Sequence, residues 1–356
     1  MKNYQSQFEE LLEIAGKHNA SDLHLSVGRY PTLRIDDKLQ NISEYSILTS
    51  EQIEGLINEF LPEEKKEQLL KFKEVDFSHN YKDKLRFRVN VFYQKGFLAA
   101  ALRFFLPKIK TVKELNLPTI IEKFTNYSQG LLLIVGPTGH GKTTTLAALI
   151  DYINHQQTKH IITIEDPIEY IFEQDKSIIS QREVGTDARS FSRALRSALR
   201  QDPDVIMVGE MRDLETMSTA LTAAETGHLV LATLHTNSAS QTIDRIIDSF
   251  PTDAQNQVRT QLASTLLGVV SQRLIPMPSG GRIPAVELMI SNSATRNLIR
   301  EGKIYQIDLV IETSMDEEMI SLNRSLANLV HKGDISIENA ETYSLNVADL
   351  RNFLNK

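Results

Sequence analysis

Near its middle the chain carries a glycine-rich segment, Gly136-Pro137-Thr138-Gly139-His140-Gly141-Lys142-Thr143-Thr144. It fits the pattern G-x-x-x-x-G-K-[ST] and lies between an apolar run, residues 131–135, and a helix-forming stretch, residues 146–150, which is the context of a phosphate-binding loop. Glycines let successive N–H groups turn inward towards a triphosphate, and the following helix adds its positive end. We therefore expect these nine residues to bind ATP, with the Lys142 amine at the β- and γ-phosphates and the Thr143 hydroxyl on Mg²⁺. A glycine-rich surface turn is the alternative, and the preceding strand disfavours it.

Composition limits the class of protein. The 356 residues are 41% apolar and 24% charged, which is typical of a globular chain long enough for two domains. The formal net charge of −7 gives no overall attraction to nucleic acid or anionic lipid. With no cysteine, disulfides, Cys-ligated zinc and thiol catalysis are excluded. Residues 1–10 do not resemble a signal peptide, and no stretch approaches the roughly 18 apolar residues of a membrane span, so we expect a cytoplasmic protein.

The first hundred residues read as an α+β domain. Apolar periodicity predicts a helix over residues 8–18, alternation predicts strands over 21–25, 32–35 and 85–92, and a Glu/Lys-rich segment over 50–73 is helical. Residues 106–118 carry prolines near both ends with charges between, and are the best candidate for a linker.

From residue 120 onward, apolar runs alternate with helical stretches. Runs at 131–135, 161–164, 205–208 and 229–234 are short and rich in Val, Ile and Leu, as strands of a parallel sheet covered on both faces are, and a further run lies at 284–290. Ligands of open α/β sheets bind at the carboxyl ends of such strands.

Three of these strands end in groups suited to a nucleotide. Glu210 follows the run 205–208 and could hold and polarise the attacking water. Glu165 and Asp166 follow the run 161–164 and could face Mg²⁺ or its waters, and His235 is placed to sense or stabilise the γ-phosphate. A single acidic strand end is usually a solvated turn, but three strand ends that carry such polar groups in one phosphate-loop domain favour a site.

A basic helical face is predicted over residues 191–204. Arg193, Arg196 and Arg200 follow a spacing of three and then four residues. They form either a solvated face or contacts to a phosphate or to a neighbouring subunit's carboxylates, so Arg196 and Arg200 stay as interface or phosphate candidates.

Four stretches together resemble the Walker A, Asp box, Walker B and His box of the secretion-superfamily ATPases, in the same order and spacing: residues 136–144, 163–170, 194–213 and 227–237. Within that superfamily, residues 20–25 and 294–303 resemble PilT-type type IV pilus retraction ATPases. The second stretch is similar to the family's retraction motif, with Thr295 where isoleucine is usual and with Arg296, Asn297 and Arg300 retained.

The resemblance implies an α/β fold with a PAS-like N-terminal domain over residues 1–105, a linker over 106–118, a RecA-like ATPase core over 119–290 and a helical C-terminal region over 291–356. It also implies a ring of six subunits in which the N-terminal domain of one packs on the core of the next. By position, Arg88 and Arg103 would approach the nucleotide from the N-terminal domain, with Arg86 a weaker candidate. Glu210 would be catalytic with Glu165 in support, His228 and His235 would be coupled to the nucleotide, and His140, where serine is common, would contribute its backbone N–H.

The activity implied is a hexameric motor that hydrolyses ATP with Mg²⁺ to retract type IV pili in twitching motility. Its partner would be the inner-membrane platform protein of the pilus, placing the motor at the cytoplasmic face of that membrane with no transmembrane segment of its own.

Three alternatives remain. Pilus extension or type II secretion ATPases typically carry a tetracysteine zinc module and an extra N-terminal domain. This sequence has no cysteine, and little more than a hundred residues precede the core, so we expect retraction. A nucleic-acid motor would want a basic channel interleaved with aromatic residues, which the charge of −7 and the lack of tryptophan disfavour, so no direct nucleic-acid partner is expected. A scaffold that binds ATP without turnover is disfavoured by Lys142, Thr143, Glu165 and Glu210.

Overall fold

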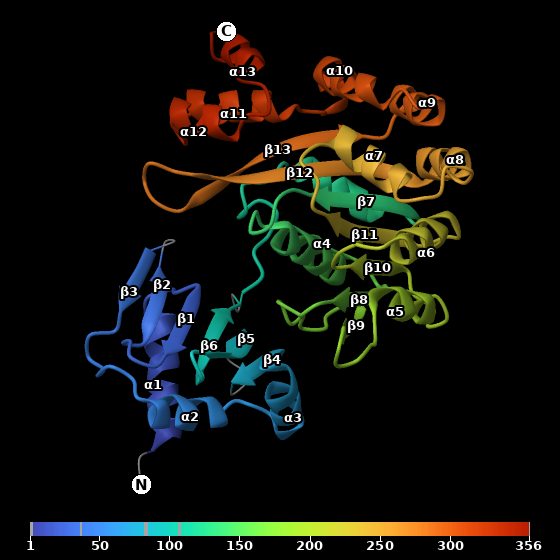
Figure 1. Cartoon of the computed structure of the whole chain (residues 1–356). Helices are drawn as coiled ribbons and strands as arrows, with labels where there is room; N and C mark the ends of the chain where they lie inside the picture. The colour runs from blue at the N-terminus through green and yellow to red at the C-terminus, as the bar shows by residue number, and fades with distance from the viewer. Residues whose placement is uncertain (1–2, 36–37, 82–84, 106–107, 356) are drawn as a thin grey trace. The chain divides into compact units, whose positions relative to one another are not determined.

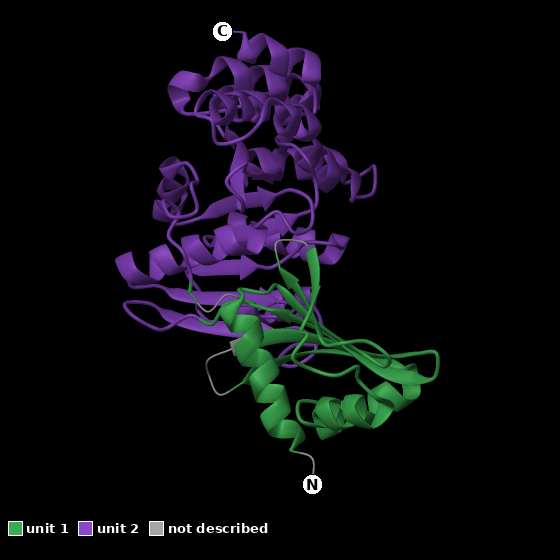
Figure 2. Ribbon diagram, turned by 90° about the vertical axis from the view of Figure 1, so that its left-hand side faces the viewer, with its two compact units in different colours: residues 1–108, 169–171 green, residues 109–168, 172–356 purple. Residues whose placement is uncertain are grey.

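The computed structural model describes residues 3–35, 38–81, 85–105 and 108–355. The chain divides into two compact units (Figure 2), one of residues 1–108 with 169–171 and the other of residues 109–168 with 172–356. Of the expected linker, residues 106 and 107 lie outside the described residues, and residues 109–118 contain no helix or strand.

The first unit is built on a six-stranded antiparallel sheet in the order β3-β2-β1-β6-β5-β4. Its strands are β1 (Asp22–Ser26), β2 (Thr32–Ile35), β3 (Lys38–Asn41), β4 (Glu74–Tyr81), β5 (Leu85–Gln94) and β6 (Phe97–Phe104). The helices are α1 (Tyr4–Lys17), α2 (Ser50–Asn58) and α3 (Glu63–Phe72). As the periodicity predicted, α1 buries Phe8, Leu11, Leu12 and Ala15 in one hydrophobic core with the sheet.

Two features of this unit differ from the sequence-based expectation. The helical segment over residues 50–73 is two helices, because the Pro62 ring fixes its own φ at the N-cap of α3 and Pro62 has no N–H to continue α2. Strands β3, β4 and β6 were not predicted, since β3 is exposed throughout and β6 carries three alanines, which favour helix over strand.

The second unit contains a seven-stranded sheet in the order β13-β12-β7-β11-β10-β8-β9 (Figure 1). All neighbouring strands are parallel except β12 and β13, which form an antiparallel pair. The strands are β7 (Gly130–Val135), β8 (His160–Glu165), β9 (Ile178–Glu183), β10 (Val205–Val208), β11 (Leu229–Leu234), β12 (Leu266–Pro276) and β13 (Arg282–Ile290). The parallel sheet expected from the four apolar runs is confirmed in β7, β8, β10 and β11.

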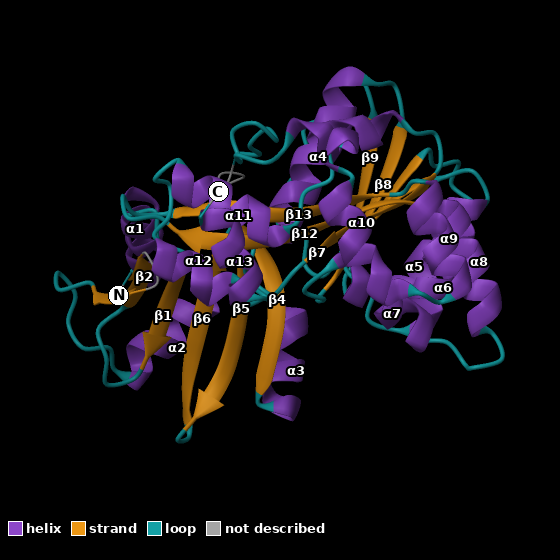
Figure 3. Cartoon of the chain, turned by 90° about the horizontal axis from the view of Figure 1, so that it is seen from above, coloured by secondary structure: helices purple, strands orange, loops and turns teal. Residues whose placement is uncertain are grey.

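Helices cover both faces of this sheet, with α4 on one side of the strands and α5 to α9 on the other (Figure 3). They are α4 (Lys142–Gln156), α5 (Phe191–Ala198), α6 (Leu214–Glu225), α7 (Ala239–Asp248), α8 (Gln255–Thr265), α9 (Ser293–Glu301), α10 (Ile307–Thr313), α11 (Leu322–His331), α12 (Ile337–Tyr343) and α13 (Val347–Leu354). Short 3₁₀ segments are η1 (Thr119–Asn126), η2 (Ile304–Gln306) and η3 (Met315–Glu317). In the described part of the chain, no helix combines the length and apolar character needed to cross a bilayer.

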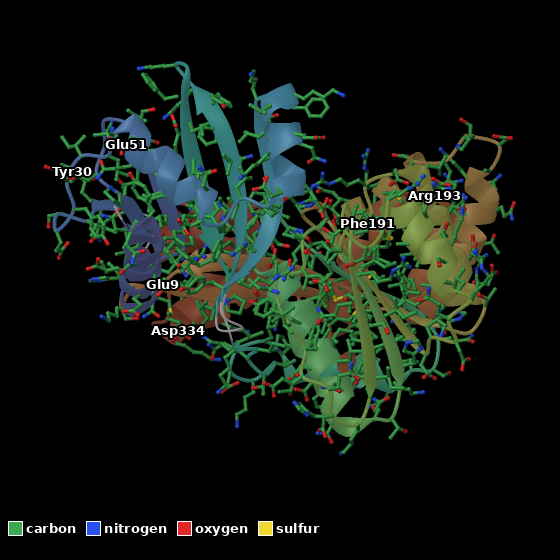
Figure 4. The ribbon with its side chains drawn as sticks, turned by 90° about the horizontal axis from the view of Figure 1, so that it is seen from below. Glu9, Tyr30, Glu51, Phe191, Arg193 and Asp334 are labelled. Carbon is green, nitrogen blue, oxygen red and sulfur yellow. The ribbon has the colours of Figure 1, made fainter. Side chains whose placement is uncertain are left out.

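The helix expected over residues 191–204 is shorter than predicted. It ends at Ala198, because Asp202 adopts a left-handed conformation with φ +53° and Pro203 follows. Arg193 lies on α5 beside Phe191 (Figure 4), but Arg200 lies in the turn beyond the helix. The predicted single face of three arginines is therefore wrong at Arg200.

The C-terminal helices share their core with the sheet. Ile299, Ile307 and Ile311 of α9 and α10 belong to the same hydrophobic cluster as the inward side chains of β7, β8, β10 and β11. A second cluster joins α11 to β12 and β13 through Leu326, Ile275 and Ala285. These helices are thus part of the second unit's packing.

Candidate functional site

The glycine-rich loop joins β7 to α4 at the carboxyl end of β7. Gly136, Gly139 and Gly141 all have positive φ, at +143°, +79° and +81°. A Cβ on Gly136 would overlap the carbonyl oxygen of Gln272, and one on Gly141 would lie 2.8 Å from the Gln272 Nε2. Side chains are therefore excluded where the loop curls, which leaves a cradle of backbone groups suited to phosphate oxygens.

Gln272 on β12 holds the loop from outside. This side chain is 3% exposed; its Nε2 donates to the His140 carbonyl at 2.8 Å, and its Oε1 accepts from the Thr145 hydroxyl at 2.7 Å. Both ends of the amide are thus satisfied by the phosphate loop and the first turns of α4. Sequence reasoning missed Gln272; the only signal was a polar Ser-Gln-Arg triplet, residues 271–273, inside an otherwise apolar run.

The His140 ring also contacts β12. Its Nδ1 accepts from the backbone N–H of Leu274 at 2.9 Å, so the neutral ring carries its proton on Nε2. Burial lowers the pKa of His140, and the positive charges of Arg273, Arg282 and Lys142 lower it further. The ring therefore stays neutral and bonded to the strand.

Lys142 begins α4 and is 7% exposed. Its Nζ donates to the carbonyl oxygens of Gly136 at 2.8 Å and Pro137 at 2.9 Å, and lies 3.3 Å from the Nδ1 of His235. The amine is thus held at the centre of the loop.

His235 connects the loop to Glu210. Its Nδ1 lies 3.3 Å from the Thr138 hydroxyl as well as from the Lys142 amine, and its Nε2 lies 3.4 Å from Glu210 Oε2. Lys142 can only donate, so Nδ1 accepts and Nε2–H donates to the carboxylate. The other Glu210 oxygen pairs with the Arg212 Nε at 2.7 Å. One carboxylate is therefore oriented from both sides.

Glu165 lies at the end of the neighbouring strand β8 and is 3% exposed. Its Oε1 accepts from the Thr163 hydroxyl at 2.6 Å and from the Gln181 Nε2 at 3.2 Å. Gly209 donates its N–H to the Ile164 carbonyl at 2.8 Å, which fixes the ends of β8 and β10 side by side. The structure thus brings Glu165 and Glu210 to adjacent strand ends at the edge that carries the loop.

Glu183 was not predicted from the sequence. It ends β9, is 7% exposed and accepts from the backbone N–H of Ile168 at 3.0 Å, so it fixes the segment that follows Glu165. A lone glutamate in a polar strand carries no sequence signal for this role.

His228 is not brought to this site within one chain. It lies just before β11, whereas His235 follows the other end of the same strand, and its Nδ1 lies 3.0 Å from the Ala223 carbonyl. Arg196 pairs with Glu215 across α5 and α6, and Arg200 is exposed.

The remaining candidates have local partners. On α9, Arg296 donates from Nε to the Ser291 hydroxyl at 3.1 Å, and Arg300 donates to Asn297. In the first unit, the Nε of Arg88 lies 3.5 Å from the Oδ1 of Asp76, and the Nε of Arg103 donates to the Oδ1 of Asp22 at 2.9 Å.

The sequence is similar to those of known proteins along most of its length. The profile of the family described as type II/IV secretion system protein matches residues 108–325. The type IV pilus retraction ATPase PilT of Pseudomonas aeruginosa is 47% identical over 93% of this chain and 96% of its own length. A twitching motility protein of Neisseria gonorrhoeae is 43% identical over 89% of this chain and 84% of its own.

The structure is similar to the same kind of protein as the sequence is. A crystal structure of the pilus retraction motor PilT with bound ADP superposes with a TM-score of 0.89 at 47% identity, covering 96% of this chain and 98% of that one. A phosphate loop, a paired carboxylate and a bridging histidine at one sheet edge thus occur in a chain that belongs to the type II/IV secretion system protein family and, within it, to the PilT-type pilus retraction ATPases.

Proposed function

We propose that this chain is the ATP-hydrolysing motor of type IV pilus retraction. The observation that carries the proposal is the continuous set of contacts from Lys142 through His235 to Glu210, which joins the group that would bind phosphate to the group that would activate water. The similarity to PilT along nearly the whole length of both chains supports retraction over extension or secretion.

ATP would bind with its phosphates against the backbone N–H groups of the loop. The Lys142 amine would exchange the Gly136 and Pro137 carbonyls for β- and γ-phosphate oxygens. Charge-assisted contacts to phosphate are stronger than those to neutral carbonyls, which favours the exchange.

Mg²⁺ fits this donor set. In phosphate sites magnesium keeps several waters and takes one or two protein oxygens plus phosphate oxygens. The Thr143 hydroxyl, in the first turn of α4, would hold it, and Glu165 and Glu210 would accept from its waters. Among the residues described, no group of three or more His, Asp and Glu side chains could hold a metal by itself. When bound, the ion would neutralise charge that develops on the phosphates.

Glu210 would accept a hydrogen bond from the attacking water and take its proton. Arg212 and His235 hold this carboxylate by its two separate oxygens, so its orientation towards the water is fixed before the nucleotide arrives. The His235 ring, which contacts Lys142 and Thr138, would then sense or stabilise the γ-phosphate.

The finer architecture belongs to the same proposal: a PAS-like domain over residues 1–105, a RecA-like core over 119–290, and six subunits in a ring. Arg88 and Arg103 would leave Asp76 and Asp22 and reach a neighbouring subunit's nucleotide. His228 would be coupled to the nucleotide, and Arg196 and Arg200 would lie at subunit contacts or at a phosphate. The α9 face of Arg296, Asn297 and Arg300 would transmit force to the pilus platform protein at the cytoplasmic face of the inner membrane.

The test uses the full chain with MgATP and a strain that lacks its retraction motor. Lys142→Ala should abolish both phosphate release and the rescue of twitching, because the phosphates lose their buried cation. Lys176→Ala, at an exposed lysine of the same unit, should leave both intact. Turnover by Lys142→Ala would reject the ATP site, whereas wild-type turnover without rescue would reject only the role in retraction.

A further inference from the structure

A buried carboxyl group lies outside the site described so far. Glu287 on β13 is 7% exposed, and its Oε1 accepts from the backbone N–H of Ala239 at 2.7 Å. Ala239 is the first residue of α7 and lies four residues after His235, so Glu287 bonds the chain just beyond the segment that carries the histidine.

The contact completes the start of α7 from a distant strand. As the N-cap, the Ser238 hydroxyl accepts from the N–H of Gln241 at 3.2 Å. The Ala239 N–H is one of the first N–H groups of the helix, which have no partner within it, and Glu287 on β13 supplies that partner.

A second residue of the same ladder bonds the segment nearer to His235. Ser271 on β12 lies directly opposite Glu287 in the β12–β13 register, and its hydroxyl donates to the Asn237 carbonyl at 2.9 Å. Arg273, two residues on, donates from Nη2 to the Asn237 Oδ1 at 3.3 Å. The chain just after His235 is thus bonded to two strands, at Asn237 and at Ala239.

The position is costly for a carboxyl group. Burial raises the pKa of Glu287 to about 7, with Asp308 on α10 adding to the rise, while the Ala239 N–H and Arg273 oppose it. Buried groups with strongly shifted pKa values are concentrated at functional sites.

We propose that Glu287, together with Ser271, is a positioning residue that fixes residues 235–238 and thereby places the His235 ring between Lys142 and Glu210. The inference rests on the proposed function, and it extends the hydrolytic site to the β12–β13 strand pair. Its geometric basis is one bond at Asn237 and one at Ala239, on either side of Ser238, both to residues that lie opposite each other in the β12–β13 ladder.

The test compares three variants of the full chain. Glu287→Met keeps the side-chain volume and removes the acceptor, whereas Glu287→Gln keeps an acceptor oxygen. Ser325→Ala is the matched control, because the Ser325 hydroxyl accepts from the N–H of Val286, the adjacent residue of β13, at 3.0 Å in an equally buried site. It breaks a comparable hydrogen bond to the next residue of the same strand.

In Glu287→Met, kcat for ATP should fall about ten- to a hundredfold, the cost of a small misplacement of a catalytic group, while KM changes by less than about twofold. Hydrogen exchange of residues 235–242 should accelerate in the same variant. Glu287→Gln should restore both properties to near the wild-type values, and Ser325→Ala should alter neither. If Glu287→Met does not fold, Ser271→Ala should show the same pattern with a kcat about threefold lower.

An unchanged exchange rate at residues 235–242 in Glu287→Met, or in Ser271→Ala where that variant replaces it, would overturn the proposal. So would equal losses in Ser325→Ala or no rescue by Glu287→Gln. A wild-type chain that hydrolyses no ATP would instead reject the proposed function, while the exchange measurement would still decide whether Glu287 fixes the segment.

Discussion

His235 occupies the position on which the site depends. Its two ring nitrogens make different hydrogen bonds: Nδ1 accepts from Lys142 and Thr138, and Nε2–H donates to Glu210. Since a single tautomer serves all three contacts, movement of the ring would change its contacts to the phosphate loop and its contact to Glu210 together. This linkage gives a physical reason why a bound γ-phosphate would alter the environment of Glu210.

Glu287 makes stability depend on pH. Its pKa is 4.5 when exposed and about 7 in the fold. Stabilisation by the neutral form is therefore complete below the unfolded pKa and is lost as pH rises through about 7, at a cost of about 3 kcal/mol in all. Glu287→Gln should raise the free energy of unfolding at about pH 8 and lose that advantage below about pH 5. Urea unfolding of the wild type and of Glu287→Gln, from about pH 5 to about pH 8, measures the difference between their free energies of unfolding. A difference that does not vary with pH would contradict the raised pKa of Glu287.

Thr295 illustrates how a helix start is secured. Its hydroxyl accepts from the Asn292 N–H at 2.9 Å, and Asn292 Oδ1 accepts from the Thr295 N–H at 2.9 Å, which is a capping box at the beginning of α9. The threonine that departs from the family's isoleucine thus satisfies the helix end while its side chain remains buried.

Thr295→Ala should lower the free energy of unfolding by about 1 kcal/mol, the usual contribution of a cap. Thr313→Ala, an exposed helical threonine, is the control and should change it by about 0.5 kcal/mol or less. Chemical denaturation of both variants measures the effect. Equal changes in the two would show that the capping box contributes nothing.

Strands differed in how far the sequence could predict them. β7, β8, β10 and β11 are covered on both faces and therefore read as continuous apolar runs, so their existence could be predicted, and with it the place of the polar side chains that follow their ends. β9 is a polar edge strand without a clear pattern, and β12 follows directly on α8, where an apolar run does not distinguish helix from strand. Gln272 and Glu287 were missed because their partners lie far away in sequence and meet them only through the pairing of β12 with β7 and β13.

At the scale of the molecule, the C-terminal helices cannot be removed without damage to the catalytic unit. Ile299, Ile307 and Ile311 lie in the same core as the strands of the sheet. Truncation before Ser291 would expose that core, so loss of activity in a truncated chain would not separate force transmission from folding. Substitutions on the exposed α9 face avoid this problem.

Arg300→Glu reverses an exposed charge on that face. Phosphate release should stay within about twofold of the wild-type rate, since surface substitutions change stability little, while twitching should be lost. Lys332→Glu, an equal charge reversal on the exposed end of α11, should preserve both. Normal twitching by Arg300→Glu would remove α9 from the coupling path.

The most direct test of Glu210 as the base that activates water is single-turnover phosphate release by Glu210→Gln with MgATP. Because the amide cannot take a proton from water, release should fall about a hundredfold or more while radiolabelled ATP remains bound with wild-type affinity. Release at the wild-type rate from ATP-loaded Glu210→Gln would contradict this role of Glu210 and place the catalytic base elsewhere.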